Sequence, residues 1–191
     1  MSKEIPLPYS GLRVLDISQG IAGPYCAHIL WQQGADVIKV EPPETGDPLR
    51  AWRMLHEGTS VWWAAHARNK RSITLNLREP EGQDVIRQLA KDPDIVIENF
   101  RPGALEKWGI GFKDLHAINP KLIMLRVSGY GQTGPYKDRP GFGVIGEAMG
   151  GLRYLTGEAG RPPVRTGVSI GDTLSGLHGV IGILLALRHR E

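Results

Sequence analysis

The sequence is short of several features that commonly reveal a function. Cys26 is the single cysteine among 191 residues, which excludes an intrachain disulfide and a zinc site built from several cysteines. The first residues lack the apolar core of a signal peptide, and the longest apolar run, 180–187, is far shorter than the ~20 residues that span a bilayer. We therefore expect a cytoplasmic protein that makes no membrane contact.

Common catalytic and ligand-binding patterns are missing as well. The six histidines show no metal-ligand spacing, and there is no G-x-S-x-G turn to present a serine nucleophile. We expect no metal ion and no bound prosthetic group. The net charge of +3 comes from scattered basic residues with acids among them, whereas nucleic-acid binding favours clustered ones. The mild excess of Lys and Arg is better suited to a small polyphosphate ligand.

What the sequence does contain is an alternation of short apolar runs with longer mixed segments. This pattern predicts strands at 13–17, 35–41, 72–77, 94–98 and 122–127, and helices within 20–34, at 80–89 and at 173–190. Alternating strands and helices indicate an α/β fold with a doubly wound, mainly parallel sheet. Ligands bind beyond the carboxyl ends of such strands. Polar and glycine residues gather at those ends, in 18–23, 41–46, 99–103 and 128–134.

Two motifs have both a functional and a plain interpretation. Residues 129–134 match GxGxxG after a predicted strand, but a dinucleotide site needs a helix to start at once, and Pro135 follows instead. We interpret the motif as a glycine-rich turn at a strand end. Three tryptophans could stack on an adenine ring, although such a cluster more often packs within the fold: Trp52, Trp62 and Trp63.

Asp172 stands before the last predicted helix, and the residues alone leave two interpretations of it open. As an N-cap, its carboxylate would accept hydrogen bonds from the free backbone N–H groups of the first turn. As a nucleophile, it would be kept ionised by the same N–H groups, and the neighbouring Gly171 would let a bulky thioester approach.

Several segments, in the same order and spacing, resemble class III CoA-transferases of the formyl-CoA and carnitine CoA-transferase types. The resemblance runs from about Leu12 to Arg190 and therefore covers nearly the whole chain. The segments that carry it are VLDISQGIAGP (14–24), GADVIKVEP (34–42), GDPLR (46–50), NKRS (69–72), ENFRPG (98–103), SGYGQTGP (128–135) and GVSIGD (167–172).

The resemblance implies a fold and a reaction. The fold is a Rossmann-like large domain, completed by the far carboxyl end of the polypeptide, with a small domain between and two subunits interlocked as a homodimer. Residues 1–191 would be the amino-terminal part of the CoA-binding large domain, without the small domain and the completing segment. The reaction is transfer of coenzyme A from an acyl-CoA to a free carboxylic acid. Asp172 would be the nucleophile that carries the covalent intermediates.

The same resemblance implies a set of CoA-binding residues. Lys and Arg side chains suit the phosphates of coenzyme A, and an aromatic ring suits its adenine. For the two lysines of the set, a solvated surface charge is the plain alternative. The residues are Gln19, Ile21, Ala22, Lys70, Asn99, Phe100, Arg101, Lys107 and Trp108.

Departures from the family pattern leave alternative functions open. Many relatives carry an acid where Gly143 stands and Gln where Glu147 stands, so the intermediate is handled differently here or another residue compensates. An acyl-CoA racemase of the same superfamily needs a histidine near Phe142, where none is found. An intramolecular CoA isomerase would use the same aspartate. The chain ends at Glu191 without a helix stop signal, which also favours a piece of a longer protein, a split chain or a non-catalytic CoA-binding subunit.

Overall fold

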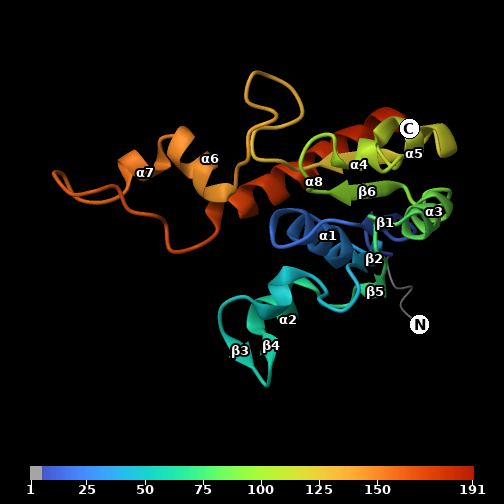
Figure 1. Cartoon of the computed structure of the whole chain (residues 1–191), viewed down its shortest axis with the longest axis horizontal. Helices are drawn as coiled ribbons and strands as arrows, with labels where there is room; N and C mark the ends of the chain where they lie inside the picture. The colour runs from blue at the N-terminus through green and yellow to red at the C-terminus, as the bar shows by residue number, and fades with distance from the viewer. Residues whose placement is uncertain (1–5) are drawn as a thin grey trace.

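A parallel sheet of five strands forms the centre of the protein (Figure 1). The computed structural model describes residues 6–191. The strands lie in the order β5-β2-β1-β6-β7, and each pairs in parallel with its neighbours. This arrangement confirms the predicted α/β fold with a mainly parallel sheet. The strands are β1 Arg13–Asp16, β2 Asp36–Glu41, β5 Arg71–Thr74, β6 Ile95–Glu98 and β7 Ile123–Arg126.

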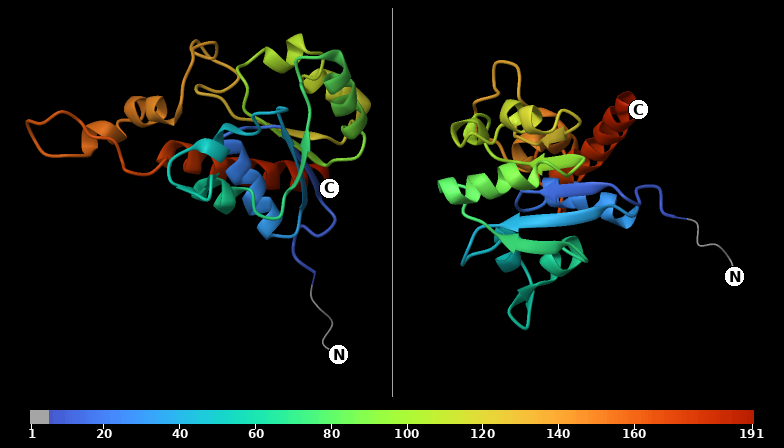
Figure 2. Two further views of the ribbon diagram at one scale, coloured as in Figure 1. Left: turned by 60° about the horizontal axis from the view of Figure 1, so that its bottom comes forward. Right: turned by 90° about the vertical axis from the view of Figure 1, so that its right-hand side faces the viewer.

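Helices cover both faces of the sheet (Figure 2). Successive residues of a strand point to opposite faces, so Val96 and Ile97 of β6 belong to different cores. On one face, Leu30 of α1 and Ile183 of α8 pack with Ile97. On the other, Leu115 of α5 belongs to the core that contains Val96, together with residues of α3 and α4. The helices are α1 Ala22–Gln32, α3 Pro80–Leu89, α4 Ala104–Lys107, α5 Phe112–Ile118 and α8 Ile170–Arg190.

The order of the strands reverses between β1 and β6. From β1 the chain continues outward through β2 and β5, whereas β6 leads to β7 on the other side. The loops that follow β1 and β6 therefore diverge, and in doubly wound sheets ligands bind in the crevice that this leaves. Two hydrogen bonds join the two loops: the Gln19 amide donates to Asn99 Oδ1 at 2.8 Å, and Asn99 Nδ2 donates to the Gln19 carbonyl at 2.6 Å.

Two further segments lie outside the sheet and are not among the elements that the sequence predicts. The first contains a short 3-10 helix, a small hairpin and helix α2. The second contains α6 and α7 and extends away from the sheet (Figure 1). The GxGxxG segment is a loop, and no helix begins between the end of β7 and the start of α6 at Gly143. This agrees with a glycine-rich turn. The elements are η1 Pro48–Ala51, β3 Leu55–His56, β4 Thr59–Ser60, α2 Val61–His66, α6 Gly143–Met149 and α7 Leu152–Leu155.

Helix α8 begins earlier than the sequence predicts. Its first residue is Ile170 rather than Thr173, and Ser169 is the N-cap, whose carbonyl accepts the Thr173 N–H at 3.0 Å. Asp172 is thus the third residue of the helix. Its interpretation as the N-cap is wrong, because the backbone already turns into the helix before the carboxylate is reached.

Helix α8 is also long and apolar enough, by length and composition alone, to cross a membrane. The run 180–187 by itself is too short for this, so the sequence did not single the helix out. One face of α8 packs on α1 and β7. The other face leaves large apolar side chains exposed, among them Leu177, Ile181 and Leu185. Core helices of other proteins pass the same test of length and composition, so the finding describes the helix and not its surroundings.

Candidate active site

The crevice at the reversal point receives Asp172 because α8 packs unusually close to α1. A Cβ at Gly176 would lie 2.8 Å from the Ala22 carbonyl oxygen and 2.9 Å from the Tyr25 ring, so only glycine permits this approach. Gly179 permits the same approach to Leu125 of β7, whose Cδ2 would lie 2.7 Å away. The start of α8 is therefore held against the start of α1. Asp172 lies one helical turn before Gly176 and is placed by this contact.

Asp172 lines two clefts that meet at its side chain. The first has a volume of about 510 Å³ and includes Gln19, Asn99 and Arg165 in its wall. The second, of about 330 Å³, includes Asn99 and Arg101. Residues that follow β1 and β6 line the first cleft, and residues that follow β6 and β7 line the second. These are carboxyl ends of strands, where the sequence predicts a ligand site.

The carboxylate of Asp172 is half-buried and has few partners. No residue in the range 6–191 donates a hydrogen bond to it or forms an ion pair with it. Burial raises the pKa of Asp172 above its usual value; the charge of Arg165 opposes the rise in pKa, and the charge of Glu147 adds to it. A carboxylate without hydrogen bonds keeps its lone pairs available, so this arrangement suits a nucleophile better than a structural acid.

Helix α6 closes the wall of the site opposite α8. A Cβ at Gly143 would lie 3.1 Å from Asp172 Oδ2, and one at Gly171 would lie 2.8 Å from the Gly143 carbonyl oxygen. The two glycines let the start of α6 touch the start of α8. Glu147, one turn further along α6, is buried; its Oε1 lies 3.8 Å from Arg165 Nε, and Thr166 Oγ1 donates to its Oε2 at 3.4 Å.

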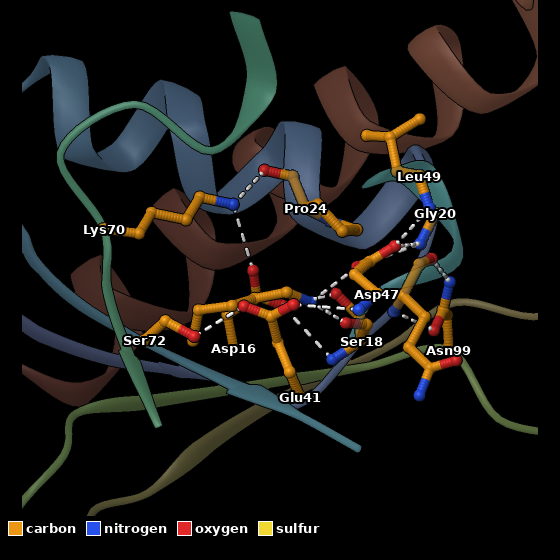
Figure 3. A network of polar contacts seen from close by, with 12 residues as sticks. Asp16, Ser18, Gly20, Pro24, Glu41, Asp47, Leu49, Lys70, Ser72 and Asn99 are labelled. Atoms are coloured by element: carbon orange, nitrogen blue, oxygen red, sulfur yellow. Dashed lines mark hydrogen bonds and ion pairs between the residues drawn. The ribbon is translucent and has the colours of Figure 1, made fainter. Parts of the chain in front are cut away.

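A buried ionic cluster supports the loop that carries Gln19 (Figure 3). Lys39 of β2 is fully buried, and its Nζ lies 3.0 Å from Asp47 Oδ2 and also donates to the Ser18 carbonyl. Asp47 Oδ1 in turn accepts the Gly20 amide at 3.0 Å. Lys39 and Asp47 therefore fix the backbone of the loop after β1, the first at the Ser18 carbonyl and the second at the Gly20 amide.

The cluster includes Lys70, which the family resemblance places at coenzyme A. The Lys70 ammonium donates to Asp16 Oδ2 at 3.0 Å and to the Pro24 carbonyl at 2.7 Å, and its side chain is 2% exposed. Burial lowers the pKa of Lys70, while the charge of Asp16 works against that lowering. Lys70 lines neither cleft at Asp172. In this structure Lys70 links the segment before β5 to β1 and α1 through these two hydrogen bonds.

Most of the other expected CoA-binding residues lie around the clefts. Gln19 and Ile21 line the first cleft, and Ala22, Arg101 and Phe100 line the second. Asn99 lines both. A third cleft of about 680 Å³ is lined by Gln19, Phe100 and Trp108, so Gln19 joins it to the first. The rings of Phe100 and Trp108 meet edge to face at 5.4 Å. Lys107, the last residue of α4, is exposed and lines none of the three.

Several residues of the site were not identified as site residues from the sequence, and four of them matter for its charge and shape. Arg53, Trp62 and Arg165 line the first cleft, and Glu147 stands behind Arg165. Trp62 was noted only as one of the three tryptophans. For Arg53 and Arg165 the sequence contains no spacing signal, because 112 residues separate two side chains that the fold brings to one cleft.

Comparison with known proteins places the chain among CoA-transferases. A family model described as CoA-transferase family III matches residues 9–191. The chain is 54% identical to a succinyl-CoA–D-citramalate CoA-transferase of Chloroflexus aurantiacus, over 100% of this chain and 48% of that protein. It is 41% identical to a succinate–glutarate CoA-transferase of Agrobacterium fabrum, over 95% and 47% respectively. The crystal structure of a CAIB/BAIF family protein from Brucella suis superposes with a TM-score of 0.92 at 42% identity, over 97% of this chain and 50% of that one.

Fold and clefts together define an α/β protein that holds a half-buried carboxylate at the switch point of a parallel sheet. The family match over nearly the whole chain identifies it further: the chain belongs to CoA-transferase family III. This confirms the resemblance seen in the sequence. The chain spans about half the length of the curated relatives it matches.

Proposed function

We propose that the protein transfers coenzyme A from an acyl-CoA to a free carboxylic acid through covalent intermediates on Asp172. The observation that carries this proposal is the half-buried carboxylate of Asp172, which makes no hydrogen bond within residues 6–191 and lies where two clefts meet. Membership of CoA-transferase family III supports transfer of coenzyme A in general, and the arrangement of Asp172 supports the covalent route.

The proposed reaction proceeds by four exchanges at carbonyl carbons. The Asp172 carboxylate attacks the donor thioester, which forms an acyl-aspartyl anhydride and releases CoA thiolate. The thiolate then attacks the aspartyl carbonyl, which forms an aspartyl-CoA thioester and releases the donor acid. The acceptor carboxylate attacks this thioester and forms a second anhydride with release of the thiolate. Attack of the thiolate on the acceptor carbonyl yields the new acyl-CoA and restores Asp172. Division into such steps is the general advantage of a nucleophilic catalyst.

The three clefts suggest how coenzyme A would lie. We propose that its adenine end occupies the third cleft beside Phe100 and Trp108, and that the thiol arm passes Gln19 to reach Asp172. Arg101 lines the second cleft, and Arg101 and Lys107 are the chain neighbours of Phe100 and Trp108, so both would be available to the phosphates. The buried Lys70 would act by holding α1 against β1. The proposal thus departs from the expectation that Lys70 contacts coenzyme A. It retains CoA binding for the other expected residues.

Racemisation is the weaker candidate for this site. It needs an acid–base pair beside the thioester, typically with a histidine. Among the described residues, no histidine lines the two clefts at Asp172, and Phe142 stands where the racemase pattern needs one. An intramolecular CoA isomerase would use Asp172 in the same way and differs only in the origin of the acceptor.

The test is chemical trapping of the intermediate. The protein, expressed from its complete reading frame, is incubated with acyl-CoA and treated with hydroxylamine or borohydride, and the peptide that contains Asp172 is analysed by mass spectrometry. We expect a hydroxamate or a reduced residue at Asp172. Asp172→Ala should lose the adduct and reduce transfer by roughly 10³-fold or more, as is typical of a lost nucleophile.

Asp138→Ala is the matched control, because Asp138 is an exposed acid that lines none of the three clefts. It should retain both the adduct and the activity. An unmodified Asp172 in protein that binds acyl-CoA would contradict the covalent mechanism and would favour a CoA-binding role without catalysis.

A further inference from the structure

We propose that Arg53, supported by Trp62, binds the second carboxylate of a dicarboxylic acyl group whose reacting end lies at Asp172. The inference rests on the proposed CoA transfer and adds the class of acid that is transferred. Arg53 and Trp62 line the first cleft together with Asp172. Arg53 is exposed, so the cleft offers an accessible cation to a substrate that already has its first carboxyl carbon at the nucleophile.

The charge balance of the first cleft favours an anionic ligand. Asp172 is the single acidic residue among the described residues that line it, whereas Arg53 and Arg165 are both basic. Arg165 lies 3.8 Å from the Glu147 carboxylate, which partly balances its charge. No Asp or Glu in the range 6–191 forms an ion pair with Arg53. An arginine without a carboxylate partner inside a ligand cleft is the kind of group that recognises a substrate carboxylate.

A comparison with Arg50, three residues earlier, shows what is unusual about Arg53. Arg50 also stacks on a tryptophan, with its guanidinium 3.9 Å from the centre of the Trp63 ring, but its Nε and Nη2 donate to Glu41 at 2.7 and 2.8 Å. Arg53 stacks on Trp62 at 4.7 Å and has no such acid. Stacking orients a guanidinium and leaves its edge N–H groups free to form hydrogen bonds.

The backbone holds Arg53 in a conformation that most residues avoid. Its φ is 61°, in the left-handed region. The residues on either side are tied down: the buried Ser60 hydroxyl donates to the Trp52 carbonyl at 2.8 Å, and the Val61 amide donates to the Met54 carbonyl at 3.0 Å. Unfavourable backbone conformations persist where the surroundings impose them and often mark ligand contacts.

The position of Arg165 assigns the two arginines different roles. Arg165 lies 3.8 Å from Glu147 of α6, the helix whose start at Gly143 touches Asp172, so Arg165 stands at the reacting end of the cleft. Its charge accordingly opposes the effect of burial on the pKa of Asp172. Arg53 lies on the tryptophan side of the same cleft, stacked on Trp62. Arg53 is thus suited to the far carboxylate and Arg165 to the near one.

The test compares two acyl-CoAs of equal length, succinyl-CoA and butyryl-CoA, of which only the first carries a free carboxylate. The protein expressed from its complete reading frame is assayed for adduct formation at Asp172 and for KM and kcat with each. We expect wild-type protein to prefer succinyl-CoA. Arg53→Gln should raise KM for succinyl-CoA by about 10- to 100-fold, the value of a charge-assisted hydrogen bond, and leave butyryl-CoA unchanged. Arg53→Lys should restore part of the preference.

Arg188→Gln is the control, because Arg188 is an exposed arginine at the far end of α8. It should behave as wild type with both substrates, and Arg53→Gln should unfold at the wild-type temperature. Equal losses with both acyl-CoAs, or an unchanged ratio between them, would overturn the role of Arg53 while the Asp172 adduct still formed. Absence of an adduct from either acyl-CoA in wild-type protein would instead overturn the proposed transfer and, with it, this inference.

Discussion

Asp16 is buried and Asp172 is half-buried, and both lie at the same edge of the sheet. The two carboxylates differ in their ion pairs and in their hydrogen bonds. Asp16 ends β1, and its carboxylate contacts Lys70 at 3.0 Å and Lys39 at 3.9 Å and accepts a hydrogen bond from Ser18. Burial alone would raise the pKa of Asp16, but the charges of Lys39 and Lys70 and the hydrogen bond outweigh it, so that the pKa lies below the usual value. Asp172 lacks these partners, and its pKa is raised.

The difference suits Asp16 to a supporting role and Asp172 to the proposed role of nucleophile. The hydrogen bonds from Lys70 and Ser18 that lower the pKa of Asp16 also occupy its lone pairs, and a carboxylate paired in this way is a poor nucleophile. Glu41 belongs to the same paired group: burial favours its neutral form, yet hydrogen bonds from Arg50 and Ser72 bring its pKa to about 2. The paired acids thus fix the loop that shapes the cleft, and Asp172 lines the cleft itself.

The largest effect that tests this contrast is loss of a lysine from the buried cluster. Lys39→Met leaves Asp47 and Asp16 buried with fewer counter-charges, because all three side chains are fully buried. Breaking a buried ion pair in this way costs about 3–5 kcal/mol of unfolding free energy. Lys70→Met should be destabilising by a similar mechanism, since it also removes a partner of Asp16. Urea unfolding followed by circular dichroism measures both.

Lys107→Met is the matched control for the two buried lysines. Lys107 is exposed and forms no ion pair among residues 6–191, so its loss should change stability by less than about 0.5 kcal/mol. The comparison would break if Lys70→Met unfolded like wild type and instead weakened CoA binding, measured by calorimetry. Lys70 would then contact the ligand, as the family resemblance implies.

A smaller effect is expected where α6 touches Asp172. An added Cβ at Gly143 would lie 3.1 Å from Asp172 Oδ2 and 3.3 Å from its backbone nitrogen, closer than ordinary contact. Gly143→Ala should therefore displace the carboxylate by a fraction of an ångström and slow adduct formation by about tenfold, since misplacement by 1 Å costs up to 10²-fold. The rate of adduct formation is followed by rapid quench and mass spectrometry.

Gly182→Ala controls for the change from glycine to alanine. Gly182 lies in α8, and apart from its own stretch of helix no described atom stands within 4 Å of the position that its Cβ would take. It should leave the rate unchanged and slightly stabilise the helix. An unaffected rate in Gly143→Ala would mean that Asp172 reacts from a different position.

The sequence predicted those parts of the fold that depend on local pattern. Strand β6 follows from an apolar run, and α3 was predicted with the observed bounds, because Pro80 marks its first turn. The start of α8 was missed by three residues, since Ser169 and Asp172 are both suitable N-cap residues by sequence and the packing of α8 on α1 decides between them. One of the two interpretations left open for Asp172 was therefore a cap that Ser169 occupies.

The candidate site was predicted only where a family motif marked it. Asp172, Gln19 and Asn99 stand in such motifs, and the fold brings all three to one cleft. The burial of Lys70 was not foreseen, because a lysine in a polar segment has the pattern of a surface residue. Its burial depends on Asp16, a residue 54 positions earlier. Contacts over such distances follow from the sheet topology, which local sequence does not encode.

The smallest expected effect concerns the pH dependence of the reaction. Burial raises the pKa of Asp172, and the charge of Glu147 raises it further, against Arg165. Only the ionised carboxylate attacks, so adduct formation should fall as the pH drops through this raised pKa. Glu147→Gln removes the like charge and the 3.8 Å partner of Arg165, and both changes lower the pKa of Asp172. The acid limb of the rate profile should therefore move to lower pH.

Glu158→Gln is the control, because Glu158 is an exposed acid that pairs with Arg161. It should leave the profile in place. A shift of the limb to higher pH in Glu147→Gln would show that Glu147 acts on Asp172 through the position of Arg165 and not through its own charge.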